Sequence, residues 1–181
     1  MMKVITGTLR GRRIDTLEGL ATRPTTQRVK EALFSAIQFE IEGRRVLDAF
    51  AGSGQLGIEA VSRGAVRCVF VDSAKEAVDL VSRNLKTLGI EKQCAVLCHD
   101  TMAYLRTARE QFDLVFLDPP YGAGLLIPAL NEAARITAPG GIIVCESDER
   151  AELPEGAGVF SLYRSYRYSH VKLWIYRGET L

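Results

Sequence analysis

The sequence predicts an α/β fold built on a mostly parallel β-sheet, and three observations lead to this prediction. From Arg45 onward, short apolar runs alternate with segments that have the apolar spacing of helices. Such repeated βα units imply parallel strands with helices on both faces of the sheet. Near the C-terminus, residues 159–164 and 170–176 are two further strand candidates with a short connection, which requires an antiparallel pair.

These elements make a seven-stranded sheet that ends in an antiparallel C-terminal strand. The parallel strands are expected at residues 46–47, 68–71, 94–97, 112–117 and 142–146. Helices are expected after a glycine-rich loop at 52–57, over 74–88, in a short segment ending near 108, and through 130–136.

The first 43 residues form an extension that precedes this pattern. Residues 3–8 and 12–17 predict a β-hairpin around Leu9-Arg10-Gly11. The stretch Arg23-Pro24-Thr25-Thr26 supplies helix-start residues, and the apolar residues that follow at four-residue spacing predict an amphipathic helix ending near Phe39. We therefore expect one domain, residues 1–181, with an N-terminal extension (1–43) and an α/β core (44–181).

Composition indicates a soluble globular protein, with 47% hydrophobic and 25% charged residues in 181. The net charge is only +1, but basic residues crowd the N-terminal segment, so a local basic face is expected there. We find neither a signal-peptide pattern nor an apolar run of about 18 to 20 residues, and we expect a cytoplasmic protein.

The four cysteines lie in or beside expected strands, and their spacing lacks the paired C-x2-C units of a zinc site. We interpret them as reduced core residues and expect no metal. They are Cys68, Cys94, Cys98 and Cys145.

Four aspartates follow four successive expected strands: Asp48, Asp72, Asp100 and Asp118. The carboxyl ends of parallel strands meet at one edge of the sheet, which is where proteins of this architecture bind ligands. Carboxylates gathered at one edge repel one another unless cations or hydrogen-bond donors accompany them. The pattern therefore predicts a ligand site at this edge.

The segment Gly52-Ser53-Gly54-Gln55-Leu56-Gly57 matches the G-x-G-x-x-G pattern of dinucleotide sites. Asp48 precedes this loop and would bring a negative charge toward a pyrophosphate, which disfavours a dinucleotide. A ligand with an ammonium and a sulfonium group and no phosphate suits that charge. S-adenosylmethionine is such a ligand.

The stretch Asp118-Pro119-Pro120-Tyr121 ends a strand with a stiff loop, because neither proline can donate a hydrogen bond to a sheet. The loop offers a carboxylate, backbone carbonyls and an aromatic ring. These groups suit a flat molecule that carries an amino group, since they can accept its two hydrogens and stack on its face.

Asp48-Ala49-Phe50-Ala51-Gly52-Ser53-Gly54 resembles motif I of the class I S-adenosylmethionine-dependent methyltransferases, and Asp118-Pro119-Pro120-Tyr121 resembles their motif for methylating exocyclic amino groups. Ile5-Thr6-Gly7, Arg10-Gly11-Arg12, Arg23-Pro24-Thr25-Thr26 and residues 28–34 look like the N-terminal signature of the bacterial 16S rRNA guanine-N2 methyltransferases, whose target is guanine 966. The resemblance covers essentially the whole chain. It implies a Rossmann-like class I methyltransferase fold.

The resemblance also implies roles for individual residues. The catalytic residues would be Asp118, Pro119, Pro120 and Tyr121, of which Asp118, Pro119 and Tyr121 would face the target base. The cofactor-binding residues would be Asp48, Phe50, Ala51, Gly52, Ser53, Gly54, Asp72, Ser73, Asp100 and Thr101. In this set Asp48 would lie near the methionine amino group, Asp72 would bind the ribose hydroxyls, and Asp100 would receive the adenine amino group.

For RNA we expect a phosphate-binding face on the N-terminal extension. It would comprise Arg10, Arg12, Arg13, Arg23, Thr25 and Arg28. The expected partner is 16S rRNA, within the small ribosomal subunit or an assembly intermediate.

Other functions stay open at this point. A DNA adenine-N6 methyltransferase shares the Asp-Pro-Pro-Tyr logic, although this chain has little room for a target-recognition region. A protein glutamine-N5 methyltransferase would more usually carry Asn in place of Asp118. A pyrimidine C5 enzyme needs a cysteine nucleophile, and the loop after Leu117 has none. A non-catalytic RNA-binding module and an NAD-dependent enzyme are further alternatives.

Overall fold

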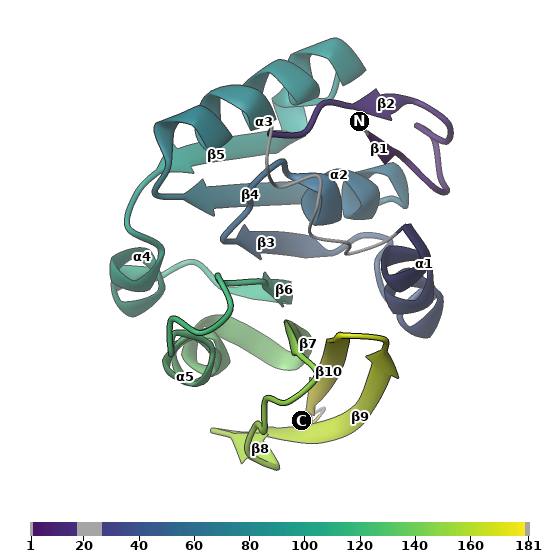
Figure 1. The fold of residues 1–181 in the computed structure, drawn as a ribbon. Helices are drawn as coiled ribbons and strands as arrows, with labels where there is room; N and C mark the ends of the chain where they lie inside the picture. The colour runs from purple at the N-terminus through teal and green to yellow at the C-terminus, as the bar shows by residue number, and fades with distance from the viewer. Residues whose placement is uncertain (1, 18–26, 180–181) are drawn as a thin grey trace.

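A twisted eight-stranded sheet crosses the molecule, and helices cover both of its faces (Figure 1). The computed structural model describes residues 2–17 and 27–179. The strand order is β5-β4-β3-β6-β7-β10-β9-β8. The strands of the sheet are β3 (Arg45–Ala49), β4 (Arg67–Asp72), β5 (Cys94–Cys98), β6 (Phe112–Leu117), β7 (Thr137–Asp148), β8 (Gly156–Ala157), β9 (Phe160–Tyr168) and β10 (Val171–Gly178).

The strand directions confirm the predicted topology. Strands β5, β4, β3, β6 and β7 are mutually parallel, β10 pairs antiparallel with β7, and β9 pairs antiparallel with β10. The predicted count of seven strands was one too low, because β8 pairs Gly156 and Ala157 with the first residues of β9. This two-residue strand has no apolar alternation that a sequence pattern could show.

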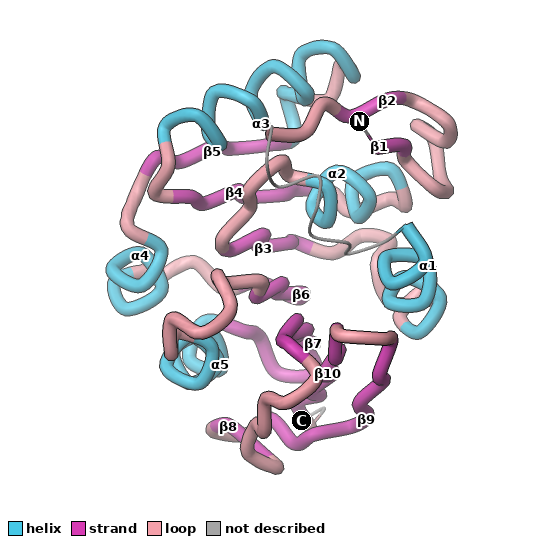
Figure 2. Tube along the Cα trace, in the orientation of Figure 1, coloured by secondary structure: helices cyan, strands magenta, loops and turns pink. Residues whose placement is uncertain are grey.

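Two groups of helices bury the two faces of the sheet (Figure 2). On one face lie α1 (Gln27–Ala36), α2 (Gln55–Ser62) and α3 (Lys75–Leu88), and on the other α4 (Thr101–Thr107) and α5 (Leu126–Ile136). A short 3-10 helix, η2 (Glu91–Gln93), follows α3. Each expected helix of the core is present, and α3 begins within one residue of its predicted start.

The N-terminal hairpin is shorter than predicted. Only β1 (Met2–Lys3) and β2 (Arg13–Ile14) pair, antiparallel, and the residues between them form turns. The backbone N–H groups of Ile5 and Thr6 donate to the Glu59 carboxylate on α2, so they are not available to a partner strand. Gly7 sits so close to α2 that a Cβ would lie 1.8 Å from the Ser62 carbonyl oxygen.

A buried ion pair joins the N-terminal extension to the core. Lys30 on α1 and Glu59 on α2 have fully buried side chains, and Lys30 Nζ lies 3.3 Å from Glu59 Oε2. Glu59 also accepts from Arg63 Nε at 3.0 Å, while Lys30 Nζ donates to the Lys3 carbonyl at 3.1 Å. Burial lowers the pKa of Lys30, although the charge and the hydrogen bond of Glu59 act to raise it. One carboxylate therefore holds β1, α1 and α2 together.

Only two of the four cysteines are the core residues that the sequence predicted. Cys68 and Cys145 are buried, Cys94 is half-buried and Cys98 is exposed; all four are free. Burial raises the pKa of the Cys94 thiol to about 12 and that of Cys68 well above its usual value, which leaves both thiols protonated at neutral pH. Among the described residues, no helix is long and apolar enough to cross a membrane.

Replacing Glu59 by Gln should destabilise the fold strongly, because it leaves the Lys30 charge buried without its partner. We expect a loss of about 3 to 5 kcal/mol in the free energy of unfolding, measured by urea titration. The control is Asp79→Asn, which breaks the exposed 2.9 Å pair between Lys75 and Asp79 and should leave the free energy of unfolding almost unchanged, because solvent screens that pair. Equal losses in the two variants would contradict the structural role of Glu59.

Candidate functional site

The loop after β3 has a strained backbone that opens a space at the edge of the sheet. Phe50 has a φ of 64° and Gly52 a φ of 54°, both in the left-handed region. That region is costly for an aromatic residue and natural for glycine. A Cβ on Gly52 would meet no atom within 4 Å, so the backbone borders open space. Strain of this kind clusters at functional sites.

Asp48 lies beneath this loop as a buried carboxylate. Its exposed fraction is 2%, and its Oδ2 accepts from the Gly57 backbone N–H at 2.9 Å. Burial raises its pKa to about 7, and the nearby Asp72 carboxylate adds to that rise, while the Gly57 hydrogen bond opposes it. A cation placed beside Asp48 would therefore stabilise its charged form.

Asp72 and Asp100 occupy the carboxyl ends of the next two strands. Asp72 ends β4, and its two oxygens accept from the backbone N–H groups of Gly52 and Ala74, each at 2.9 Å. Asp100 follows β5 and caps α4, with Oδ1 accepting from the Ala103 N–H at 2.6 Å. Asp72 thus fixes the glycine loop directly. Ser73 is exposed beside it, and Thr101 is buried at the start of α4.

The Asp118 loop starts next to the glycine loop. Strands β3 and β6 are neighbours, and their last residues, Ala49 and Leu117, are paired. Asp118 follows at once and is partly buried, Pro119 is buried, and Pro120 is exposed. The structure therefore brings together the two motifs that the sequence analysis singled out, although they lie some 70 residues apart in the chain.

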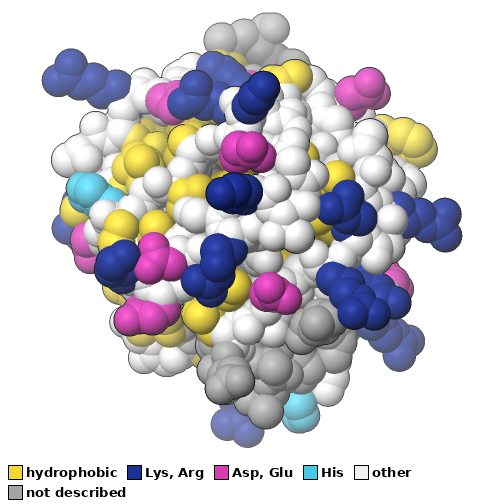
Figure 3. All heavy atoms as spheres, turned by 90° about the horizontal axis from the view of Figure 1, so that it is seen from above, with side chains coloured by type: hydrophobic (Ala, Val, Ile, Leu, Met, Phe, Trp, Pro, Cys, Tyr) yellow, Lys and Arg dark blue, Asp and Glu magenta, His cyan; other side chains and the backbone are white. Residues whose placement is uncertain are grey.

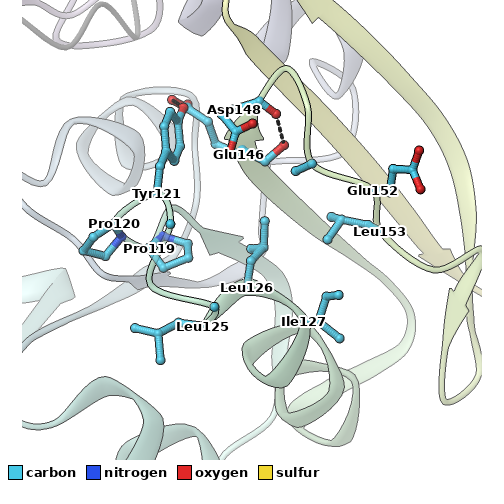
Figure 4. Close-up of a pocket in the computed structure, with 14 residues that line it drawn as sticks. Pro119, Pro120, Tyr121, Leu125, Leu126, Ile127, Glu146, Asp148, Glu152 and Leu153 are labelled. Atoms are coloured by element: carbon cyan, nitrogen blue, oxygen red, sulfur yellow. Dashed lines mark hydrogen bonds between the residues drawn. The ribbon is translucent and has the colours of Figure 1, made fainter.

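A pocket of about 320 Å³ opens on the far side of this loop, between the start of α5 and the end of β7. Pro119 and Pro120 lie on one side and Leu126 and Leu153 on the other, as Figure 4 shows. Its further lining is Tyr121, Gly122, Gly124, Leu125, Ile127, Glu146, Ser147, Asp148, Ala151 and Glu152. Asp118 itself is not part of the lining. The pocket is thus mainly apolar with an acidic end.

Glu146 is a site residue that the sequence analysis missed. It lies on β7, is 3% exposed, and accepts a 3.0 Å hydrogen bond from the Tyr121 hydroxyl. The sequence pattern that could have revealed it is an acidic residue directly after the apolar run 142–145. Like the four aspartates, Glu146 lies near the carboxyl end of a parallel strand. Asn84 on α3 was missed as well: its Nδ2 donates to the Ser53 carbonyl of the glycine loop and to the Asp15 carbonyl.

Among the residues expected to contact RNA, those that the structure describes lie on the hairpin and α1, away from this edge (Figure 1). Arg23 and Thr25 fall outside the described residues. Arg10 and Arg13 are exposed in the hairpin, and Arg28 is exposed on α1. Arg12 donates to the Thr87 carbonyl near the end of α3, at 2.8 Å. Because helices of βα units run back against the strands, the hairpin lies toward the opposite edge from Asp118.

Basic side chains are spread over the face that carries α3 and the hairpin, among acidic ones (Figure 3). No cluster of three or more His, Cys, Asp or Glu side chains suited to a metal ion occurs within residues 2–17 and 27–179.

The raised pKa of Asp48 should make stability depend on pH. Between pH 3.8 and about 7 the folded chain holds a proton on Asp48 that the unfolded chain has released. The contribution of this proton to the free energy of unfolding is fully present below pH 3.8 and is lost as the pH rises through about 7. Between about pH 5 and pH 8, Asp48→Asn should therefore lose roughly 2 kcal/mol less stability than the wild type in urea titrations. Identical pH profiles would contradict the raised pKa.

The chain is similar in sequence to known proteins over nearly its whole length. Residues 2–177 match the model of a family described as "Conserved hypothetical protein 95". The Putative rRNA methyltransferase YlbH of Bacillus subtilis (strain 168) is 40% identical over 181 residues, which cover 97% of this chain and 98% of that protein. The Ribosomal RNA small subunit methyltransferase D of Escherichia coli (strain K12) is 32% identical over 180 residues, with 98% and 90% covered.

A solved structure, "Putative methyltransferase yhhF from Escherichia coli", superposes with a TM-score of 0.89 at 32% identity and covers 99% of both chains. This likeness confirms the predicted methyltransferase fold. The chain belongs to the family described as Conserved hypothetical protein 95, and its predicted relationship to the bacterial 16S rRNA methyltransferases is confirmed.

Proposed function

We propose that this protein transfers a methyl group from S-adenosylmethionine to the exocyclic N2 amine of a guanine in small-subunit ribosomal RNA, guanine 966 by family resemblance. The observation that carries the proposal is the pairing of Ala49 with Leu117, which sets the glycine loop beside the Asp118 loop. A cofactor held by one loop thus lies next to a base held by the other. The names of the relatives support ribosomal RNA as the substrate class.

The residues at the sheet edge fit this cofactor. Gly52 borders open space, and the buried Asp48 carboxylate would be stabilised by the ammonium group of the methionine portion. Asp72 would accept from the ribose hydroxyls and Asp100 from the adenine amino group, since a carboxylate oxygen can accept more than one hydrogen bond. When bound, S-adenosylmethionine supplies a methyl group activated by its sulfonium.

The Asp118 loop would prepare the amine for attack. The lone pair of an exocyclic amine is delocalised into the ring, so the enzyme must favour a pyramidal nitrogen. Hydrogen bonds from the two N–H groups to the Asp118 carboxylate and the Pro119 carbonyl would do so as positive charge develops on nitrogen. Asp118 need not act as a strong base.

Tyr121 would hold the base in place by stacking on it. Its hydroxyl is anchored to the buried Glu146, which restricts the ring. Removing a base from its stack costs a few kcal/mol, and stacking on an aromatic side chain, worth about 1 to 3 kcal/mol, offsets much of this. Alignment of the reactants is the larger effect, since it can remove on the order of 7 to 11 kcal/mol from a barrier.

Phosphate contacts are proposed for the N-terminal extension, at Arg10, Arg12, Arg13 and Arg28, with Arg23 and Thr25. Because the described members lie toward the edge opposite Asp118, they would bind RNA at a distance from the target base. This suits a large folded substrate such as a ribosomal subunit or an assembly intermediate. An enzyme with that substrate would act in the cytoplasm.

Asp118→Ala should abolish methyl transfer while S-adenosylmethionine still binds, because it removes an acceptor for the target amine and leaves the glycine loop intact. We expect the rate of transfer to small ribosomal subunits to fall by at least about 10²- to 10³-fold. The affinity for S-adenosylmethionine, measured by calorimetry, should stay within about threefold. Asp79→Asn, on the exposed side of α3, is the control for transfer. Loss of cofactor binding in a folded Asp118→Ala protein would place Asp118 in the cofactor site instead.

A further inference from the structure

Strand β9 exposes aromatic and basic side chains along an open edge of the sheet. Its partner β8 covers only Phe160 and Ser161, and no other strand pairs with its outer edge in the described part of the chain. In Figure 1, β9 and β8 form the end of the sheet farthest from β5. The sequence along the open edge is Tyr163-Arg164-Ser165-Tyr166-Arg167-Tyr168.

Four of these side chains and Arg177 of the neighbouring strand β10 form a continuous row, which we call the tyrosine–arginine row: Arg177, Tyr163, Arg164, Tyr166 and Tyr168. The guanidinium carbon of Arg177 lies 4.1 Å from the centre of the Tyr163 ring, and that of Arg164 lies 5.5 Å from it. Arg164 Nη1 donates to the Tyr166 hydroxyl at 3.5 Å. Tyr166 and Tyr168 are stacked, with ring centres 6.4 Å apart and planes 23° apart.

Core packing accounts for only part of the row. Tyr163 is 51% exposed and Arg164 is exposed. Tyr166 and Tyr168 are half-buried, with one part of each ring against the core beneath α1 and α2. Among the described residues, Arg164 has no carboxylate partner. The row therefore presents rings that the core holds in place, together with a guanidinium that no acidic side chain neutralises.

The row leads toward the candidate site. Because β9 is antiparallel to β10, and β10 is antiparallel to β7, β9 ends at the same edge as β6 and β7. Tyr168 pairs with Val171, which pairs with Asp148 in the lining of the pocket. Two strand spacings, roughly 10 Å, separate Tyr168 from Asp148. A strand of RNA whose base is held by the Asp118 loop can continue along the row.

We propose that the tyrosine–arginine row is a binding platform for the single-stranded nucleotides that flank the target guanine. Tyr166 and Tyr168 are alternate residues on one face of β9, about 7 Å apart along the strand, and sheet aromatics at such positions stack bases in other RNA-binding folds. The rings can stack on bases of any sequence, and Arg164 supplies positive charge for the phosphates. Arg177 is paired with Glu40 and contributes its contact with the Tyr163 ring. The proposal rests on the proposed function, because it places the flanking strand beside the loop that would hold the target base.

The test compares Tyr163→Ala/Arg164→Ala with the wild type in binding to a short guanine-containing single-stranded RNA, measured by fluorescence anisotropy. Methyl transfer to small subunits is measured in parallel. We expect RNA affinity to fall about tenfold or more, and KM for the RNA to rise with kcat unchanged. Tyr163→Phe, which keeps the ring, should bind like the wild type. Arg67→Ala, which removes an exposed guanidinium at the start of β4, is the control for loss of charge.

Binding by the double variant within twofold of the wild type would overturn the proposal. So would a dimer of the wild type in light scattering that the double variant loses, since the open edge would then pair with a second copy. If the wild type transfers no methyl group to RNA and yet binds it through the row, the proposed function fails and the platform stands. If transfer occurs and the double variant matches the wild type, the platform fails and the function stands.

Discussion

The pairing of β3 with β4 on one side and β6 on the other is the constraint on which the site depends. Because these three strands are parallel, the residues that follow each of them meet at one edge of the sheet. That edge holds the strained loop of Phe50 and Gly52, the Asp72 carboxylate that fixes it, and the Asp118 loop. Residues distant in sequence therefore become neighbours because the strands that precede them are paired.

Gathering acidic groups at one edge has an electrostatic cost, and the structure offsets it with backbone donors. Asp48 accepts from Gly57, Asp72 from Gly52 and Ala74, and Asp100 from Ala103. These hydrogen bonds stabilise the charged carboxylates and shape the loops at the same time. Asp48 still has a raised pKa because it is buried beside Asp72. A cationic ligand beside Asp48 would stabilise the charged carboxylates at this edge. The proposed cofactor, which carries an ammonium and a sulfonium group, is such a ligand.

The N-terminal extension depends on the core for its own structure. The Glu59 carboxylate accepts hydrogen bonds from two N–H groups of the extension and pairs with Lys30 of α1, although Glu59 itself belongs to the helix that follows the glycine loop. Asn84 adds a second link, from Asp15 to Ser53. These contacts link the extension directly to the elements beside the glycine loop.

Local signals in the sequence predicted most of the fold. An apolar run ending in Asp and a turn marks a parallel strand, and this rule placed Asp48, Asp72, Asp100 and Asp118 correctly. Prediction from local signals failed where a backbone group or side chain has its hydrogen-bond partner in a distant part of the chain. The N–H groups of Ile5 and Thr6 bond to Glu59, more than 50 residues away, so the hairpin is short. Glu146 was hidden inside an apolar strand, and only the folded chain shows its bond to Tyr121.

The most direct measurement is nucleoside analysis after labelled methyl transfer from S-adenosylmethionine to unmodified small ribosomal subunits, naked 16S rRNA and duplex DNA. We expect N2-methylguanosine from a ribosomal substrate. N6-methyladenine from DNA, or label in protein glutamine, would contradict the proposed substrate and leave the fold and the sheet edge as described.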